Sequence, residues 1–222
     1  MTLVLTAFGS PSTTLPAETT AAAVAELGAS GLPHAQIVAT HGPLRIQMPI
    51  AQTRVTAIGY HGAGEGALKL EPLGKRGNQG LFGRLRDRIF GSSGDALLWY
   101  QLEGGPGPAT SSLAVGAAPG TDAFSPVDGT VVAIRDVVVN RRAFGVRIDI
   151  QPASAPSLVV SVTRVRPDPA LTVGSPVIAA KTRLGSVLDL SSVERMALAR
   201  YTQDAGNHLS LEVRPAATLT LP

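Results

Sequence analysis

Short apolar runs separated by turn residues repeat along the C-terminal half of the chain. They span residues 125–139, 143–152, 157–166, 175–190 and 207–215. Val and Ile dominate these runs, and β-branched side chains suit a pleated, half-buried surface. Asp128-Gly129 is expected to supply the positive φ angles of a tight hairpin turn. The pattern predicts a mainly β domain over 105–222, built as an antiparallel β-sandwich or open barrel.

The N-terminal half alternates apolar and polar positions over strand-like lengths. Residues 44–50 and 53–61 show this alternation, and 96–104 has the composition of a further strand. We therefore expect an N-terminal β segment over 37–103, packed on the main domain. The Gly- and Pro-rich stretch 104–112 is predicted to be the link between the two.

Helical signals are confined to two short stretches. Residues 1–36 mix Ser, Thr, Pro and Ala and are expected to form a weakly ordered lead-in with at most one short helix, ended at Gly28. Ser191 stands three residues before Glu194, which is the spacing of a capping box. Apolar positions follow at helical intervals, so a helix of two to three turns is expected over 190–202.

Composition limits the chemistry that the chain can carry. The 222 residues include no Cys, which excludes disulfides, thiolate metal sites and cysteine nucleophiles, so any metal site must use His, Asp or Glu. The formal net charge of +3 gives no clear nucleic-acid signal. No apolar run reaches the length of a membrane-spanning helix, and residues 1–10 make a poor signal peptide because no basic region precedes their apolar run.

A basic, Gly-rich segment over 74–95 has two interpretations. It could be a binding loop or short amphipathic helix for an anionic partner, since Lys and Arg recur through it. It could equally be a solvated connection between strands. The second interpretation is favoured because the segment holds few of the aromatic residues that a single-strand-binding surface needs.

Three sequence blocks of the C-terminal half stand out by their composition and by the order in which they occur. They read AAPGTDAFSPVDGTVVAI over 117–134, VGSPVIAAKTRLGSV over 173–187 and GNHLSLEVRP over 206–215. In composition and order they resemble the lysostaphin-like (LytM-type) zinc endopeptidases, which cut peptidoglycan cross-bridges. The resemblance covers roughly residues 117–215 and implies the duplicated hybrid motif fold.

The same resemblance implies a zinc ion held by two His and one Asp, with two further His that act in catalysis. His208 matches the first of these His in the closing block, but Ser210 stands where a zinc ligand is expected. The first ligand pair falls on 109–115, which contains neither His nor Asp, and no His lies in 162–164. We therefore expect a degenerate site with a vestigial His208, no metal ligands and no cofactor, because hydroxyl and aliphatic groups cannot replace imidazole and carboxylate.

Residues around the inferred groove are the candidates for binding. Tyr60 and His61 end a predicted strand just before the Gly-rich turn 61–66, and an aromatic beside an imidazole can hold a polar ligand. Asn207 and Ser210 flank the vestigial histidine. Tyr201 could fill the substrate position if the predicted helix covers the groove.

The resemblance implies a non-catalytic, secreted or cell-envelope domain that binds peptidoglycan, a peptide or a protein partner through the former substrate groove. Two alternatives remain open. The first is an active metallo-endopeptidase with a relocated site, made of His61, His208 and a carboxylate such as Asp149, Asp189 or Glu212. The second is a structural or assembly module in which the groove plays no part.

Overall fold

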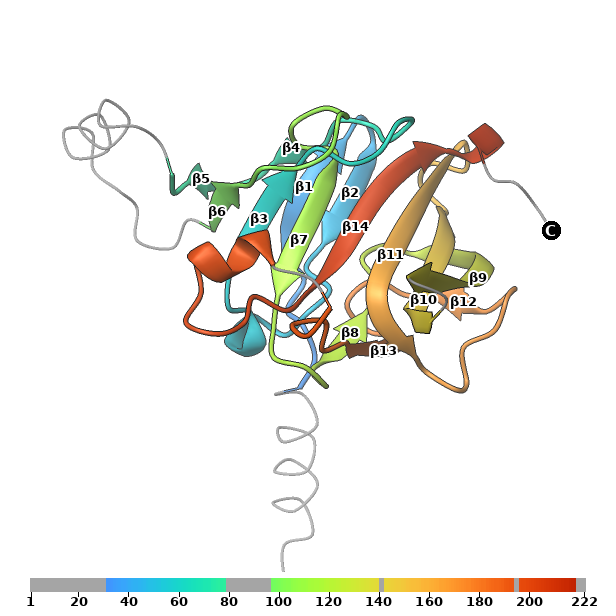
Figure 1. Ribbon diagram of the computed structural model, residues 1–222. Coiled ribbons are helices and arrows are strands. Elements are labelled where there is room, and N and C mark those ends of the chain that lie inside the picture. Colours follow the sequence, from blue (N-terminus) through green and yellow to red (C-terminus); the bar gives the residue numbers. More distant parts are fainter. Residues whose placement is uncertain (1–30, 79–96, 140–141, 194–195, 219–222) are drawn as a thin grey trace, which may run out of the picture. The chain divides into compact units, whose positions relative to one another are not determined.

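The computed structural model describes residues 31–78, 97–139, 142–193 and 196–218, and these form a mainly β structure (Figure 1). The strands are β1 (Ile37–His41), β2 (Leu44–Gln47), β3 (Ile58–His61), β4 (Glu71–Pro72), β5 (Lys75–Arg76), β6 (Leu98–Gln101), β7 (Ser112–Gly116), β8 (Asp122–Phe124), β9 (Gly129–Val139), β10 (Arg142–Pro152), β11 (Leu158–Pro167), β12 (Pro176–Val177), β13 (Arg183–Val187) and β14 (His208–Pro215). Three short 3-10 helices complete it: η1 (Gln52–Arg54), η2 (Ala197–Arg200) and η3 (Ala216–Thr218). The predicted fold class is confirmed.

The larger sheet has the order β12-β9-β10-β11-β14-β7-β3-β6-β5, with β13 and β8 branching from β11. The order does not return on itself, so the described strands form an open sheet and no closed barrel. Most pairs are antiparallel, but β6 pairs in parallel with both β3 and β5. A smaller sheet, β2-β1-β4, packs against one side of the larger one.

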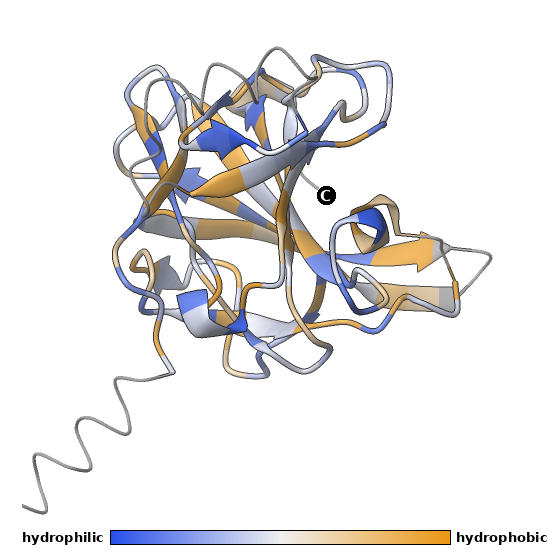
Figure 2. Cartoon of the chain, turned by 90° about the vertical axis from the view of Figure 1, so that its left-hand side faces the viewer, coloured by the Kyte–Doolittle hydropathy of each residue, from blue (hydrophilic) through white to orange (hydrophobic). Residues whose placement is uncertain are grey.

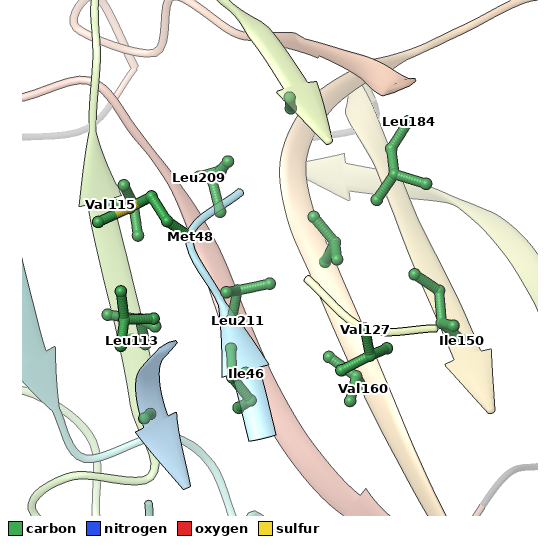
Figure 3. Close-up of a cluster of buried hydrophobic side chains, with 14 of the residues drawn as sticks. Ile46, Met48, Leu113, Val115, Val127, Ile150, Val160, Leu184, Leu209 and Leu211 are labelled. Carbon is green, nitrogen blue, oxygen red and sulfur yellow. The ribbon is translucent and has the colours of Figure 1, made fainter. Parts of the chain in front are cut away.

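The core lies between the two sheets. Side chains of β2 and the residues after it point at the centre of the larger sheet: Ile46 and Met48 face Leu113 of β7 and Leu211 of β14 (Figure 3). Apolar residues run along the strands, as Figure 2 shows. Because side chains alternate along a strand, one face of β7 and β14 is committed to this core and the other face is left for a different role.

The residues of the predicted N-terminal segment 37–103 supply strands to both sheets. Tyr60 of β3 is fully buried, donates a hydrogen bond to the carbonyl oxygen of Val38 at 2.8 Å and lies edge-on to Trp99 at 5.2 Å between ring centroids. The predicted link 104–112 is also tied down. Gly105 N–H donates to the carbonyl of Gly62, and the described residues from 32 onward belong to one compact unit.

Two local predictions are wrong. Gly129 does not have a positive φ angle; it is required because a Cβ there would stand 2.2 Å from the carbonyl oxygen of Gln151. The two- to three-turn helix over 190–202 is also not formed: its described residues make a turn at 191–193 and the single 3-10 turn of η2. Ser191 donates its hydroxyl to Asp189 at 2.6 Å, which removes the capping group.

The predicted lead-in up to residue 30 and the basic segment beyond residue 78 lie outside the described residues. In the part of the chain that is described, no helix is long and apolar enough to cross a membrane.

Candidate functional site

The face of the larger sheet that points away from the core carries the residues that the resemblance to zinc endopeptidases singles out. Ser210 of β14 lies directly opposite Ala114 of β7 on one side and Thr163 of β11 on the other. Directly opposite residues project to the same face of a sheet. The register therefore brings together the three segments 109–115, 162–164 and 208–210, and we call this the groove face.

The side chains at this position do not fit a catalytic zinc ion. Such an ion takes imidazole nitrogens and a carboxylate with one position open for water. Ala114 offers no ligand atom, and Ser210 and Thr163 offer only hydroxyl groups. Among the described residues, no group of three or more His, Asp or Glu side chains could hold a metal ion.

Leu198 of η2 lies on the groove face. Its side chain is fully buried and belongs to a small apolar cluster with Ala57, Leu102 and Ala114. A Cβ atom at Gly116 would stand 2.8 Å from Leu198 Cδ2, and one at Gly59 would stand 3.0 Å from Leu198 Cδ1. The two glycines thus leave the space that the leucine occupies.

The segment 189–207, which carries η2, is fastened at its base by Asn207. The Asn207 Oδ1 accepts the backbone N–H of Leu190 at 2.9 Å, and its Nδ2 donates to Asp189 at 3.2 Å. Hydrogen bonds from the side chain and the backbone of Ser191, and from Asn207, hold the pKa of Asp189 below its ordinary value. Asn207 is 4% exposed, and its two hydrogen bonds hold the ends of this segment together.

A second contact holds the same segment on the sheet. Arg164 donates to the sulfur of Met196 at 3.4 Å. The backbone of Arg164 has φ of 65°, in the left-handed region that is uncommon for residues other than glycine. The residue sits next to an irregularity in the pairing of β10 and β11, where the regular alternation of side chains is broken.

His208 is nearly buried, with 7% of its surface exposed. Its Nδ1 lies 2.8 Å from the carbonyl oxygen of Gly206. A carbonyl oxygen can only accept, so Nδ1 carries the hydrogen. Gly206 itself has φ of 73°, and a Cβ there would stand 2.4 Å from the backbone nitrogen of Ala199. His208 is therefore hydrogen-bonded to Gly206, the residue whose missing side chain lets η2 pack closely.

The predicted pair Tyr60 and His61 divides between the two faces of the sheet. Tyr60 points into the core, and burial raises the pKa of its hydroxyl. His61 lies on the groove face opposite Ser112, and its Nδ1 donates to the carbonyl of Gly62 at 2.8 Å. His208 pairs with Gly116, four positions along β7, so the two histidines lie about 13 Å apart along the strand. The relocated metal site is not assembled.

Buried polar groups continue along the groove face. Asp149 of β10 is fully buried and accepts hydrogen bonds from Arg147 and from Ser161, each at 2.7 Å. Glu212 lies opposite Ser161 and is paired with Arg214 at 2.8 Å. Each carboxylate proposed for a relocated site is thus bound to an arginine, except Asp189, which is held by Ser191 and Asn207.

An open cleft lies beside η2. It has a volume of about 640 Å³, and its lining includes Asn78, Gln101, Glu103, Arg200 and Tyr201. The ring of Tyr201 stacks on Tyr100, with centroids 4.2 Å apart and planes 16° apart. Of the predicted binding residues, only Tyr201 lines this cleft. We call it the η2 cleft.

Sequence reasoning did not find most of this cleft. Gln101 and Glu103 stood at the end of a predicted strand, and Arg200 in a predicted helix, with nothing to show that they meet. The signal that could have pointed to Leu198 was the pair of glycines at Gly59 and Gly116, each of which follows a β-branched residue in a strand-like run.

Comparison with known proteins gives little to identify the chain. No family model matches it, and no curated protein matches it. Among solved structures, it is similar to one described as a novel M23 metalloprotease, pseudoalterin, from the deep sea. That likeness has 12% sequence identity and a TM-score of 0.40, and covers 77% of this chain and 70% of the other. At this TM-score the likeness defines neither a family nor an activity.

Proposed function

We propose that this chain is a non-catalytic, peptidase-type domain that binds a cell-wall polymer or peptide beside its filled groove face. The observation that carries the proposal is the position of Leu198. Its buried side chain lies on Ala114, next to Ser210, where the resemblance to zinc endopeptidases calls for metal ligands and an open water position. Hydrocarbon at this point neither polarises a carbonyl group nor activates water.

Binding is assigned to the η2 cleft because it is the open part of this region with polar groups around it. Its volume of about 640 Å³ lies within the usual range of ligand sites, roughly 300–1,000 Å³. The rival function of an active metallo-endopeptidase would need metal ligands that the described residues do not bring together. The rival function of a structural module would leave the cleft without a ligand.

The test combines metal analysis, cleavage and binding. Protein purified without chelator is expected to hold no stoichiometric zinc, to leave peptidoglycan uncleaved and to sediment with insoluble peptidoglycan. A His61→Ala/His208→Ala variant is expected to bind equally, since neither histidine lines the cleft. Stoichiometric zinc that is lost in His208→Ala, together with cleavage, would establish the peptidase instead. Absence of sedimentation and of cleavage would favour the structural module.

A further inference from the structure

The η2 cleft has a wall that is fixed before any ligand arrives. Tyr100 covers one face of the Tyr201 ring, and the Tyr201 hydroxyl accepts a hydrogen bond from Asn78 Nδ2 at 3.1 Å. Asn78 is itself held by Gln101, whose backbone N–H donates to Asn78 Oδ1 at 3.0 Å and whose carbonyl accepts from Nδ2 at 2.7 Å. A ring held from two sides loses little freedom on binding, which lowers the entropic cost of stacking a ligand on it.

The amide of Gln101 is also oriented in advance. Its Nε2 donates to the carbonyl oxygens of Tyr60 at 3.0 Å and of Ala109 at 2.7 Å. These bonds use both hydrogens of the amide nitrogen. Side chains alternate along β6, so Tyr100 faces Tyr201 while the Gln101 amide anchors the strand from its other face.

Among the described residues that line the cleft, the charges cancel. Arg200 and Glu103 both line it and lie 3.9 Å apart, at 71% and 89% exposure of their side chains. A ligand with a single charge is attracted by one of these groups and repelled by the other. A hydroxyl group donates and accepts at once, so it can bond to the carboxylate and to the guanidinium without such a conflict.

We propose that the η2 cleft binds an uncharged saccharide, with an apolar ring face on Tyr201 and its hydroxyls on Glu103 and Arg200. Leu102, Ala197 and Ala199 supply apolar surface at the same cleft. The inference rests on the proposed binding function and specifies its ligand, since the glycan part of a cell-wall polymer would be recognised. A zwitterionic peptide, with its carboxylate on Arg200 and its ammonium on Glu103, is the competing occupant.

The experiment measures binding of two probes by isothermal titration calorimetry. The probes are an uncharged tetrasaccharide of N-acetylhexosamine and an unblocked pentapeptide of Gly and Ala. The intact chain is expected to bind the tetrasaccharide, with a Kd that changes less than about threefold between 50 mM and 500 mM salt, because screening acts only on charges. Tyr201→Ala is expected to raise this Kd at least tenfold, and Tyr201→Phe, which keeps the ring, less than about threefold.

A second variant guards against a folding defect in Tyr201→Ala. Glu103→Gln/Arg200→Gln removes both charges at exposed positions and replaces charge-assisted hydrogen bonds to the hydroxyls with neutral ones, so tetrasaccharide binding should weaken by less than about tenfold. The same variant should weaken peptide binding by more than about tenfold if the peptide is the occupant. Arg54→Gln, an exposed arginine outside the cleft, is the matched control.

The outcomes separate this inference from the function on which it rests. Binding of the pentapeptide without the tetrasaccharide overturns the saccharide proposal and leaves the non-catalytic binding domain in place. Tetrasaccharide binding that is unchanged in a folded Tyr201→Ala variant, or binding of neither probe, also overturns the saccharide proposal. Zinc-dependent cleavage of peptidoglycan overturns the proposed function, whether or not the tetrasaccharide binds.

Discussion

Leu198 and Gly116 are complementary in shape: a Cβ added at Gly116 would stand 2.8 Å from Leu198 Cδ2, closer than real Cβ contacts allow. The same Cβ would stand 2.6 Å from the Thr56 hydroxyl. Overpacking of this kind typically costs about 1–3 kcal/mol. Gly116→Ala is therefore expected to lower the free energy of unfolding by about that amount in urea denaturation.

A double-mutant cycle identifies the clash partner. Leu198→Ala clears the space above Gly116, so the cost of Gly116→Ala should be smaller in the Leu198→Ala background than in the original chain. Strict additivity of the two changes would show that Leu198 does not rest on Gly116. The Thr56 contact remains in both backgrounds, so the relief is expected to be partial.

Removal of the leucine side chain should itself be costly. Leu198 is fully buried, and Leu→Ala changes at such positions cost about 2–5 kcal/mol because a cavity is added to the lost transfer energy. Leu98→Ala is the matched control, since Leu98 is 48% exposed and should change stability far less. Chemical denaturation of both variants measures the difference, and equal effects would contradict the buried packing of Leu198.

Asp149 gives a prediction about a buried charge. It is fully buried and paired with Arg147, and one of its carboxylate oxygens has no hydrogen-bond partner among the described residues. Truncation to Asp149→Ala removes the carboxylate from Arg147, but the guanidinium keeps its hydrogen bond to Ser161 and is 29% exposed, so a cost of about 1–3 kcal/mol is expected. The melting temperature should fall accordingly. Glu103→Ala breaks an exposed pair and should cost at most about 1 kcal/mol.

Asp189 predicts a pH dependence at the base of the η2 segment. Hydrogen bonds from Ser191 come first among the causes that lower its pKa in the folded chain. A carboxyl group with a depressed pKa adds stability above its unfolded pKa of about 3.9, and this stability is lost as the pH falls through the folded value. The stability advantage of the original chain over Asp189→Asn should therefore shrink below about pH 4.

Acid unfolding of both chains, followed between pH 2 and 6 by circular dichroism, checks this expectation. Asp168 also has a lowered pKa, from the backbone N–H of Ala170 and from Arg183, so the original chain alone shows a combined slope. Only the difference between the two chains reports on Asp189. A difference that stays constant across this range would contradict the assignment.

The strands were predictable where an apolar run in the sequence is also long enough to form a buried strand by itself. β9, β10 and β11 are long runs with several Val or Ile residues and β14 alternates Leu and Val with polar residues, and each lies within its predicted range apart from one or two residues at the ends. β7 (Ser112–Gly116) was missed because it is short, three of its five residues are small, and it follows closely on a Gly- and Pro-rich stretch. Its strand conformation comes from pairing with β14 and β3 on both sides, which local sequence does not reveal.

The groove face shows the same limit. The absence of His and Asp at 109–115 was visible in the sequence, as was Ser210 in place of a histidine. What fills the space was not visible, because Leu198 was assigned to a regular helix. Its contact with Gly59 and Gly116 joins residues more than 80 positions apart in the chain, and such contacts are set by tertiary packing.

Tyr60 joins one sheet to the other through a single hydroxyl, and its strand β3 lies between β7 and β6. A fragment that began after residue 104 would expose the edge of β7 and part of the core at once. The C-terminal blocks are therefore expected to fold only together with the strands that precede them. The folding unit of this chain is larger than the sequence blocks that carry the family resemblance.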